Sequence, residues 1–347
     1  EMQWEKHCDA IVHGYLSGQS GAKAVLKVIS GQVNPSGKLT ESYPMVYEHC
    51  PSAAYYPGSV TSEYREGIYV GYRYYDKVKM DLRYPFGYGL SYTTFQYEDL
   101  VVTEDGATCT VRNTGDSAGC EVVQLYIHKD QDQIHRPEQE LKGFARVQLE
   151  PGQAKEVTID FDDYAFRVYS ASDKKFIIEE GTYQIRLASS SRHIHLEGSL
   201  KVRGQTIDGA DYVNQEDYFS GQVSNVSARA FESLYGQPLP SDNFDKGQPL
   251  TINDSLSHMV HAKSILARLA IKIMMGMRDR SYKKGQPDLN LFFLTNMPFR
   301  AIAKMSGGAV SLEMTQHMVT IVNGHFFRGI GRLVREFMSY RKRGIKA

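Results

Sequence analysis

The residues that could perform acid–base chemistry gather in the stretch 64–76, where Glu66 lies among tyrosines and arginines. Glu66 follows Tyr64 and Arg65, and Arg73 comes seven residues later. A general acid needs a carboxyl pKa that burial or a like charge has raised, whereas neighbouring arginines favour an ionised carboxylate. We therefore expect Glu66 to form a structural ion pair, with a catalytic acid as the alternative.

Two histidine pairs have spacings that could place both imidazoles on one side of an element. His193 and His195 alternate along an expected strand, and His258 and His261 lie three residues apart on an expected helix. Neither pair has an evident third ligand, and the four cysteines form no CxxC pair. We expect neither a metal site nor a cofactor. The sparse cysteine usage favours a reducing compartment such as the cytoplasm.

The charge of the chain is distributed unevenly. Lys plus Arg and Asp plus Glu number 40 each, but the region from residue 250 has 16 basic and 5 acidic residues, and region 1–249 has 24 and 35. A basic region can bind nucleic acid or an anionic membrane surface, or it can dock on an acidic neighbour in the same protein. The helical, Met-rich pattern favours the last of these, so no nucleic-acid partner is expected. The longest apolar run, 265–277, contains Arg268 and Lys272 and is too short to cross a membrane.

The elements that would position these residues change in type along the chain. Residues 1–94 begin with an expected strand at 10–16, a helix at 22–29 and an Asn-Pro-Ser-Gly turn at 34–37, an order that predicts a βαβ unit of a parallel sheet. We expect this α/β region to be partial and to begin partway through its fold. Its later part is rich in tyrosine, with thirteen between Tyr43 and Tyr97.

Period-two alternation of apolar residues over 95–204 predicts an antiparallel β-sandwich. The alternating positions are Cys109 and Val111; Val123, Leu125 and Ile127; Val147 and Leu149; Val157, Ile159 and Phe161; and Tyr183, Ile185 and Leu187. Residues 205–249 are polar and predict a linker. Helical periodicity returns in 250–347, with helices expected at about 252–273, 289–305, 311–322 and 326–340 and a break at Asn323-Gly324.

Three stretches resemble glycoside hydrolase family 3, and they occur in that family's order. DAIVHGYLSGQSGAKAVLKVISGQVNPSGKLTESYP (9–44) is similar to part of the family's α/β-sandwich domain. YREGIYVGYRYYD (64–76) with YPFGYGLSYTTF (84–95) is similar to the segment that leaves that domain. EVVQLYI (121–127) with RPEQELKGF (136–144) resembles the family's fibronectin type III-like domain. In the tail, MPFRAIAKMSGG and VNGHFFRGIG look like C-terminal extensions of some bacterial members.

The resemblance implies a multidomain chain: a partial α/β sandwich, then an all-β fibronectin type III-like sandwich, then an α-helical C-terminal extension. It also implies a parent enzyme of β-glucosidase type, which removes non-reducing-end β-sugars from small oligosaccharides or aryl glycosides with retention. Retaining hydrolysis needs two carboxyl groups about 5 to 5.5 Å apart. In the family the nucleophilic Asp lies in an N-terminal (β/α)8 barrel and the acid/base Glu upstream of the segment that begins near Ala10. Neither maps onto this sequence, so we expect this chain alone to be inactive and to need the missing barrel as its partner.

The stretch 64–76 then has further interpretations. Tyr64, Glu66 and Arg73 are expected either at the rim of the sugar site or in structural roles, and Arg73 and Asp76 as anchors that fix this loop to the domain. The tyrosines suit sugar stacking or loops that pack by their own side chains. Two other functions stay open: a non-catalytic partner chain or carbohydrate-binding or structural module, and a basic tail that binds a membrane surface or nucleic acid.

Overall fold

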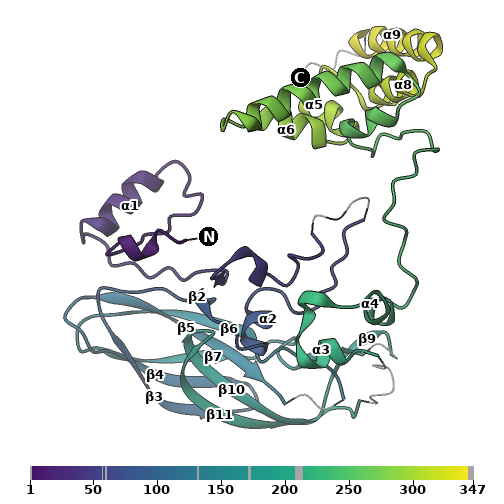
Figure 1. Ribbon diagram of the computed structural model, residues 1–347. Helices are drawn as coiled ribbons and strands as arrows, with labels where there is room; N and C mark the ends of the chain where they lie inside the picture. Colours follow the sequence, from purple (N-terminus) through teal and green to yellow (C-terminus); the bar gives the residue numbers. More distant parts are fainter. Residues whose placement is uncertain are drawn as a thin grey trace. The chain divides into compact units, whose positions relative to one another are not determined.

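The computed structural model describes residues 2–56, 58, 61–130, 133–170, 173–207 and 214–342 (Figure 1). The chain divides into two compact units, Glu1–Asp242 and Asn243–Ala347. The expected domain boundaries after residues 94, 204 and 249 stay predictions.

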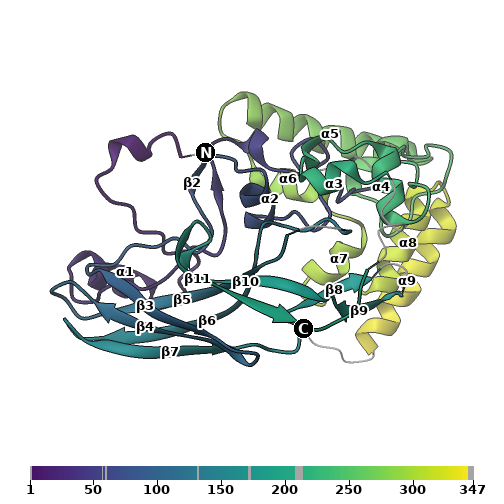
Figure 2. The same cartoon turned by 90° about the horizontal axis from the view of Figure 1, so that it is seen from below.

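Two antiparallel sheets form the body of the first unit (Figures 1 and 2). One has the order β3-β4-β7 and comprises Phe95–Val102, Gly106–Asn113 and Ala154–Asp160. The other has the order β11-β10-β5-β6 and comprises His193–Val202, Gly181–Ser190, Gly119–His128 and Glu140–Leu149. A hairpin of β8 (Arg167–Ser170) and β9 (Lys175–Ile178) lies between β7 and β10 in the chain.

The core between the two sheets confirms the period-two prediction. Every alternating apolar residue named for the sandwich is buried there except Phe161, which packs against the core while partly exposed. Successive side chains of a strand point to opposite faces, so the alternation places one complete apolar set inside. The sandwich therefore closes its core with residues of 95–202 alone.

The α/β region differs from its prediction. Helix α1 (Gly21–Ile29) forms as expected, but residues 10–16 form no strand. The pair β1 (Tyr43–Pro44) and β2 (Leu82–Tyr84) is antiparallel, so the expected parallel βαβ unit is not formed. A strand needs a neighbouring strand to satisfy its backbone groups, and no described residue forms a β-ladder with 10–16. Helix α1 also lacks a buried apolar face, since Val25 and Val28 are only half-buried.

The stretch expected to be a linker contains two short helices, α3 (Glu216–Ser220) and α4 (Ala228–Tyr235). They pack on the tyrosine-rich segment, where Tyr69, Tyr74 and Tyr75 form a buried cluster with Tyr218 and residues of 223–230. The hydroxyl of Tyr69 donates a hydrogen bond to the carbonyl of Tyr218, and that of Tyr218 donates to the carbonyl of Arg65 at 2.9 Å. These tyrosines therefore pack against one another and against the neighbouring loops and helices.

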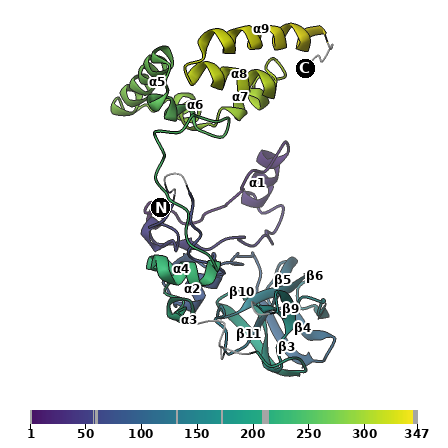
Figure 3. The same ribbon diagram turned by 90° about the vertical axis from the view of Figure 1, so that its right-hand side faces the viewer.

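The second unit is helical, as predicted (Figure 3). The described residues form the 3-10 helix η5 and the helices α5 to α9, with bounds Leu256–His261, Ile265–Lys283, Leu289–Asn296, Arg300–Met305, Leu312–Val322 and Phe326–Lys342. The single helix expected at 289–305 is divided at Met297-Pro298, because proline disfavours helical backbone in the preceding residue. Gly324 has φ 91° and separates α8 from α9 as expected. No helix in the described part of the chain is long and apolar enough to cross a bilayer.

Candidate functional site

Glu66 lies in a turn before helix α2 (Tyr72–Lys77) and is only 7% exposed. Neither predicted ion pair is formed. Arg65 Nε donates to Glu63 Oε2 at 2.6 Å, and Arg73 Nε lies 3.5 Å from Glu140 Oε1, so both guanidinium groups are directed to other carboxylates. Among the described residues, Glu66 Oε2 has no hydrogen-bond partner. Sequence adjacency to arginine was therefore a poor guide to the partner of this carboxylate.

Tyr64 and Arg73 lie in different surroundings from Glu66. Tyr64 is 69% exposed, whereas the Arg73 guanidinium lies over the ring of Tyr72, 5.3 Å from its centroid. The structure therefore holds the three residues in one segment, with an exposed ring, a buried carboxylate and a half-buried guanidinium. A role for them in sugar binding stays a prediction.

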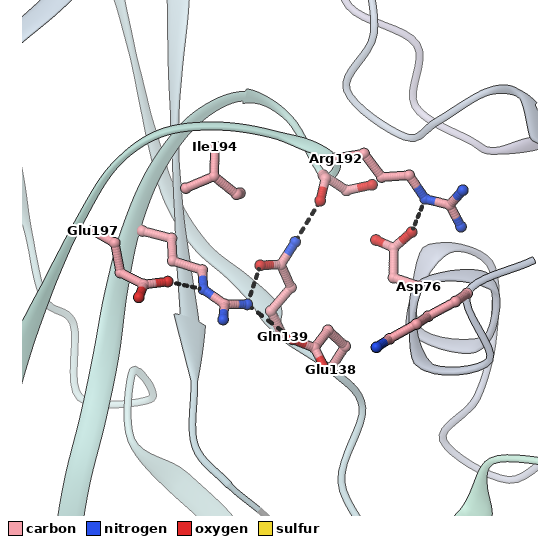
Figure 4. Close-up of a pocket in the computed structure, with 9 residues that line it drawn as sticks. Asp76, Glu138, Gln139, Arg192, Ile194 and Glu197 are labelled. Carbon is pink, nitrogen blue, oxygen red and sulfur yellow. Dashed lines mark hydrogen bonds and ion pairs between the residues drawn. The ribbon is translucent and has the colours of Figure 1, made fainter.

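A charged pocket of about 460 Å³ lies where helix α2 meets the β-sandwich (Figure 4). Its walls come from the end of α2, the residues before β6, and strands β10 and β11. The lining residues are Asp76, Lys79, Glu138, Gln139, Arg186, Ser191, Arg192, Ile194 and Glu197. Three carboxyl groups therefore face one cavity, which makes it the natural place to look for acid chemistry within this chain.

Each of these three carboxylates is paired with an arginine. Arg186 Nε donates to Glu197 Oε2 at 2.6 Å, and its Nη1 donates to Glu138 Oε1 at 3.1 Å. Arg192 Nε donates to Asp76 Oδ1 at 2.7 Å. Burial raises the pKa of Asp76, and the hydrogen bond and charge of Arg192 oppose that increase. Charge-assisted pairs of this kind fix the orientation of a carboxylate, so all three carboxyl groups are engaged with arginines in the pocket.

The same contacts fix the tyrosine-rich segment to the sandwich. Arg192 Nη2 donates to the carbonyl of Tyr75 at 2.9 Å, and the backbone N–H of Leu141 donates to the hydroxyl of Tyr72 at 2.8 Å. With the Asp76–Arg192 and Arg73–Glu140 pairs, they confirm the prediction that Asp76 and Arg73 anchor this loop. Asp76 and Arg192 are 116 residues apart, and no spacing in the sequence reveals their contact.

The histidine pairs are held by aromatic and polar neighbours. His195 stacks between Tyr97 and His193, with ring centroids 4.1 and 4.4 Å away, and burial lowers its pKa to about 4. His258 Nδ1 lies 3.1 Å from Asp254 Oδ1 and its ring contacts Phe244. The described residues contain no group of three or more side chains suited to a metal ion.

Comparisons with known proteins identify two regions of the chain. Residues 1–92 match the glycosyl hydrolase family 3 C-terminal domain, and residues 121–191 match the fibronectin type III-like domain. The "Thermostable beta-glucosidase B" of Acetivibrio thermocellus is 41% identical over 334 residues, a match that covers 93% of this chain and 39% of that protein. The "Exo-alpha-(1->6)-L-arabinopyranosidase" of Bifidobacterium breve is 43% identical over 252 residues, covering 69% of this chain and 33% of that protein.

Solved structures agree with these sequence matches. The β-glucosidase 3B of Thermotoga neapolitana in complex with α-D-glucose has a TM-score of 0.55 and 36% identity, with 59% of this chain and 30% of that chain covered. The family 3 β-glucosidase of Bifidobacterium adolescentis has a TM-score of 0.53 and 35% identity, with 61% and 33% covered. The chain thus spans well under half the length of each of these proteins. Because the Acetivibrio match covers 93% of the chain, it includes most of the helical tail.

Proposed function

The chain belongs to glycoside hydrolase family 3, to whose C-terminal part it corresponds, and we propose that the whole protein hydrolyses β-glucosides. The observation that carries this proposal is the 41% identity to a β-glucosidase across 93% of the chain, a match that includes both recognised domains. The chain spans 39% of that relative, so the activity is assigned to the whole protein.

The reaction would remove a non-reducing-end β-sugar from a short oligosaccharide or an aryl glycoside, with retention of configuration. A retaining enzyme holds a nucleophilic carboxylate and an acid/base carboxyl about 5 to 5.5 Å apart across the bond that breaks. In this proposal, an N-terminal barrel supplies the nucleophile and the region before this chain supplies the acid/base. The sandwich and its anchored tyrosine segment support that site.

This division of labour implies that the 347-residue chain alone does not hydrolyse glycosides. The support is the pairing of Asp76, Glu138 and Glu197 with arginines in the charged pocket. A glycosidase needs a carboxyl group that is free to transfer a proton to the leaving oxygen, whereas these three are held in ion pairs. Hydrolysis of an aryl β-glucoside by the purified chain would contradict this part of the proposal.

Tyr64 and Glu66 are proposed as rim residues of the sugar site, and Arg73 as a structural residue that pairs with Glu140. Tyr64 offers an exposed ring for stacking on a sugar, and Glu66 Oε2 is an acceptor with no described protein donor. In the whole enzyme, Tyr64→Ala is expected to raise KM with little change in kcat. Tyr164, which is also exposed but lies on the sandwich, provides the control Tyr164→Ala, for which both constants should stay unchanged.

A second candidate is a non-catalytic partner chain or structural module that acts beside a separate barrel polypeptide. The self-contained core of the sandwich favours a structural role for this part of the chain. The coding sequence that precedes residue 1 discriminates between the two. A continuous frame that encodes a barrel supports a single enzyme, whereas a separate barrel gene supports the partner chain.

The main proposal is tested with the complete encoded protein and two aryl glycosides. We expect kcat/KM to be highest for the β-D-glucoside and lower for the α-L-arabinopyranoside, which represents the other activity named among the relatives. If the complete protein hydrolysed neither glycoside, the proposed function would be overturned.

A further inference from the structure

Helix α9 packs on α8 through one face, which is marked by Gly329. A Cβ atom on Gly329 would lie 2.4 Å from Ile321 Cγ1, so the two helices approach closely at this position. Gly329 is buried, and Leu333, Glu336 and Tyr340 are half-buried at spacings of four, three and four residues. These four positions define the inner face of α9, because residues at such spacings share one side of a helix.

The opposite side of α9 is apolar and open. Phe327 is 90% exposed, and Val334 and Met338 are exposed by about half. At 100° per residue these three lie opposite Gly329, and the exposed Ile330 and Phe337 lie beside them. We call these five residues the apolar face of α9. A contiguous exposed apolar stripe on a helix marks an interaction surface.

Basic residues border the apolar face. Arg328, Arg332, Arg335 and Lys342 lie along one flank, between the apolar and inner faces, and the Arg341 guanidinium lies 5.3 Å from the ring centroid of Phe337. Between Phe326 and Lys342 there are five basic residues and one acidic residue, a net charge of +4. The helix thus presents aromatic and aliphatic side chains beside a row of cations.

This pattern restricts the chemistry of the partner. A second copy docked through the same face would bring two helices of charge +4 together, which like-charge repulsion opposes. A nucleic acid would satisfy the arginines through its phosphates but would leave the apolar stripe in water. An anionic lipid surface satisfies both features, because its phosphates meet the basic flank while its acyl chains receive the apolar side chains.

We propose that α9 docks in the plane of an anionic phospholipid surface, with its apolar face inserted at the boundary between headgroups and acyl chains. The inner face stays on α8, so docking needs no rearrangement of the second unit. This inference does not depend on the proposed hydrolase activity.

The proposal is tested by sedimenting the full chain with vesicles. We expect the chain to bind vesicles of equal parts phosphatidylglycerol and phosphatidylcholine at low salt, and to bind phosphatidylcholine vesicles much more weakly. Replacing Arg328, Arg332 and Arg335 with Gln should weaken partitioning roughly a hundredfold, at about fivefold per charge. High salt should reduce binding of the unaltered chain in the same direction.

The apolar contribution is tested separately by replacing Phe327, Val334 and Met338 with Ser, which should weaken partitioning by at least about tenfold. Phe144→Ser is the matched control, because Phe144 is exposed on the sandwich, and it should bind as the unaltered chain does. Circular dichroism confirms that each variant keeps its helices.

Three results would overturn the proposal. One is the absence of binding to the anionic vesicles. Another is binding to an oligonucleotide that the three Arg→Gln substitutions abolish while the three Ser substitutions leave it unchanged. The last is a dimer of the unaltered chain that the three Ser substitutions convert to a monomer without any effect on vesicle binding.

Discussion

The β-sandwich and the segment 10–33 both contain apolar residues in expected regular elements, but only the sandwich buries them. In the sandwich, Leu125 and Ile185 are fully enclosed between two sheets. In the segment, Leu16 is 101% and Leu26 is 65% exposed, and no strand forms at 10–16. An apolar stretch thus forms a strand only where neighbouring strands are available to pair with it and cover it.

A core substitution should show the largest effect. We expect Leu125→Ala to lower the free energy of unfolding of the sandwich by about 3 kcal/mol, because it leaves a cavity in a closed core. The matched change Leu26→Ala in α1 should cost less than about 0.5 kcal/mol. Urea denaturation of both variants measures this difference. Equal losses of unfolding free energy would show that α1 is buried as well and that the two regions do not differ in burial.

The anchor between the two regions should show the next largest effect. Asp76→Asn removes the charge that Arg192 binds, and we expect the free energy of unfolding to fall by about 2 kcal/mol, because a charge-assisted hydrogen bond to a buried carboxyl group is replaced by a weaker neutral one. Asp173→Asn is the control, since the Asp173–Lys175 pair is exposed at 4.0 Å and should contribute less than about 0.5 kcal/mol. Thermal melts followed by circular dichroism give both values. If the two variants were equally stable, the pocket network would not act as an anchor.

Acid should weaken the packing of the sandwich against α3. Burial lowers the pKa of His135 to about 4, and the charges of Lys77 and Arg136 lower it further. The His135 ring packs against the rings of Tyr218 and Phe219 in α3. Unfolded histidine titrates near 6.5, so between about pH 6.5 and about pH 4 the unfolded state takes up a proton that the folded state does not. Stability should therefore fall as the pH falls, by up to about 2 kcal/mol between about pH 7 and about pH 5.

The variant His135→Gln isolates this contribution to the pH dependence. Its stability should fall less steeply over the same pH range, while the part due to His195, whose pKa is also lowered to about 4, remains. Denaturation curves at several pH values give the slopes. Identical slopes for the variant and the unaltered chain would show that His135 titrates normally in the folded state.

The exposed apolar residues of the segment should affect association more than folding. We expect Leu16→Ser with Leu26→Ser to reduce self-association of the chain while its melting temperature hardly changes. Light scattering at increasing concentration measures the association. An unchanged scattering profile would show that these side chains do not mediate self-association.

The predictable parts of the structure are those in which apolar residues recur at a regular spacing along the chain. Alternation at Val123, Leu125 and Ile127 was sufficient for the sandwich, and helical spacing was sufficient for α8 and α9. The helix expected at 252–273 differs, because the chain forms η5 there and α5 begins only at Ile265 and continues to Lys283. The break at Pro298 divided a helix that periodicity alone predicted as continuous. The helices α3 and α4 were missed because they are short and depend on tertiary packing against Tyr69 and Tyr74.

The candidate site was harder to predict than the fold. The motif of 64–76 identified Arg73 and Asp76 as anchors, but their partners Glu140 and Arg192 are far away in the sequence. Glu66 was expected to pair with its nearest arginines, yet Arg65 binds Glu63 instead. Side-chain partners depend on where the folded backbone directs each group, and neighbouring charges in the sequence do not determine that direction.

The proposal that hydrolysis needs the whole protein is tested most directly with an aryl β-D-glucoside and two proteins assayed together: this chain alone and the complete encoded protein. We predict turnover by the complete protein and none above buffer by the chain, because the carboxyl groups of the charged pocket are held in ion pairs with arginines. Turnover by the chain alone that Asp76→Asn or Glu66→Gln abolishes would contradict it.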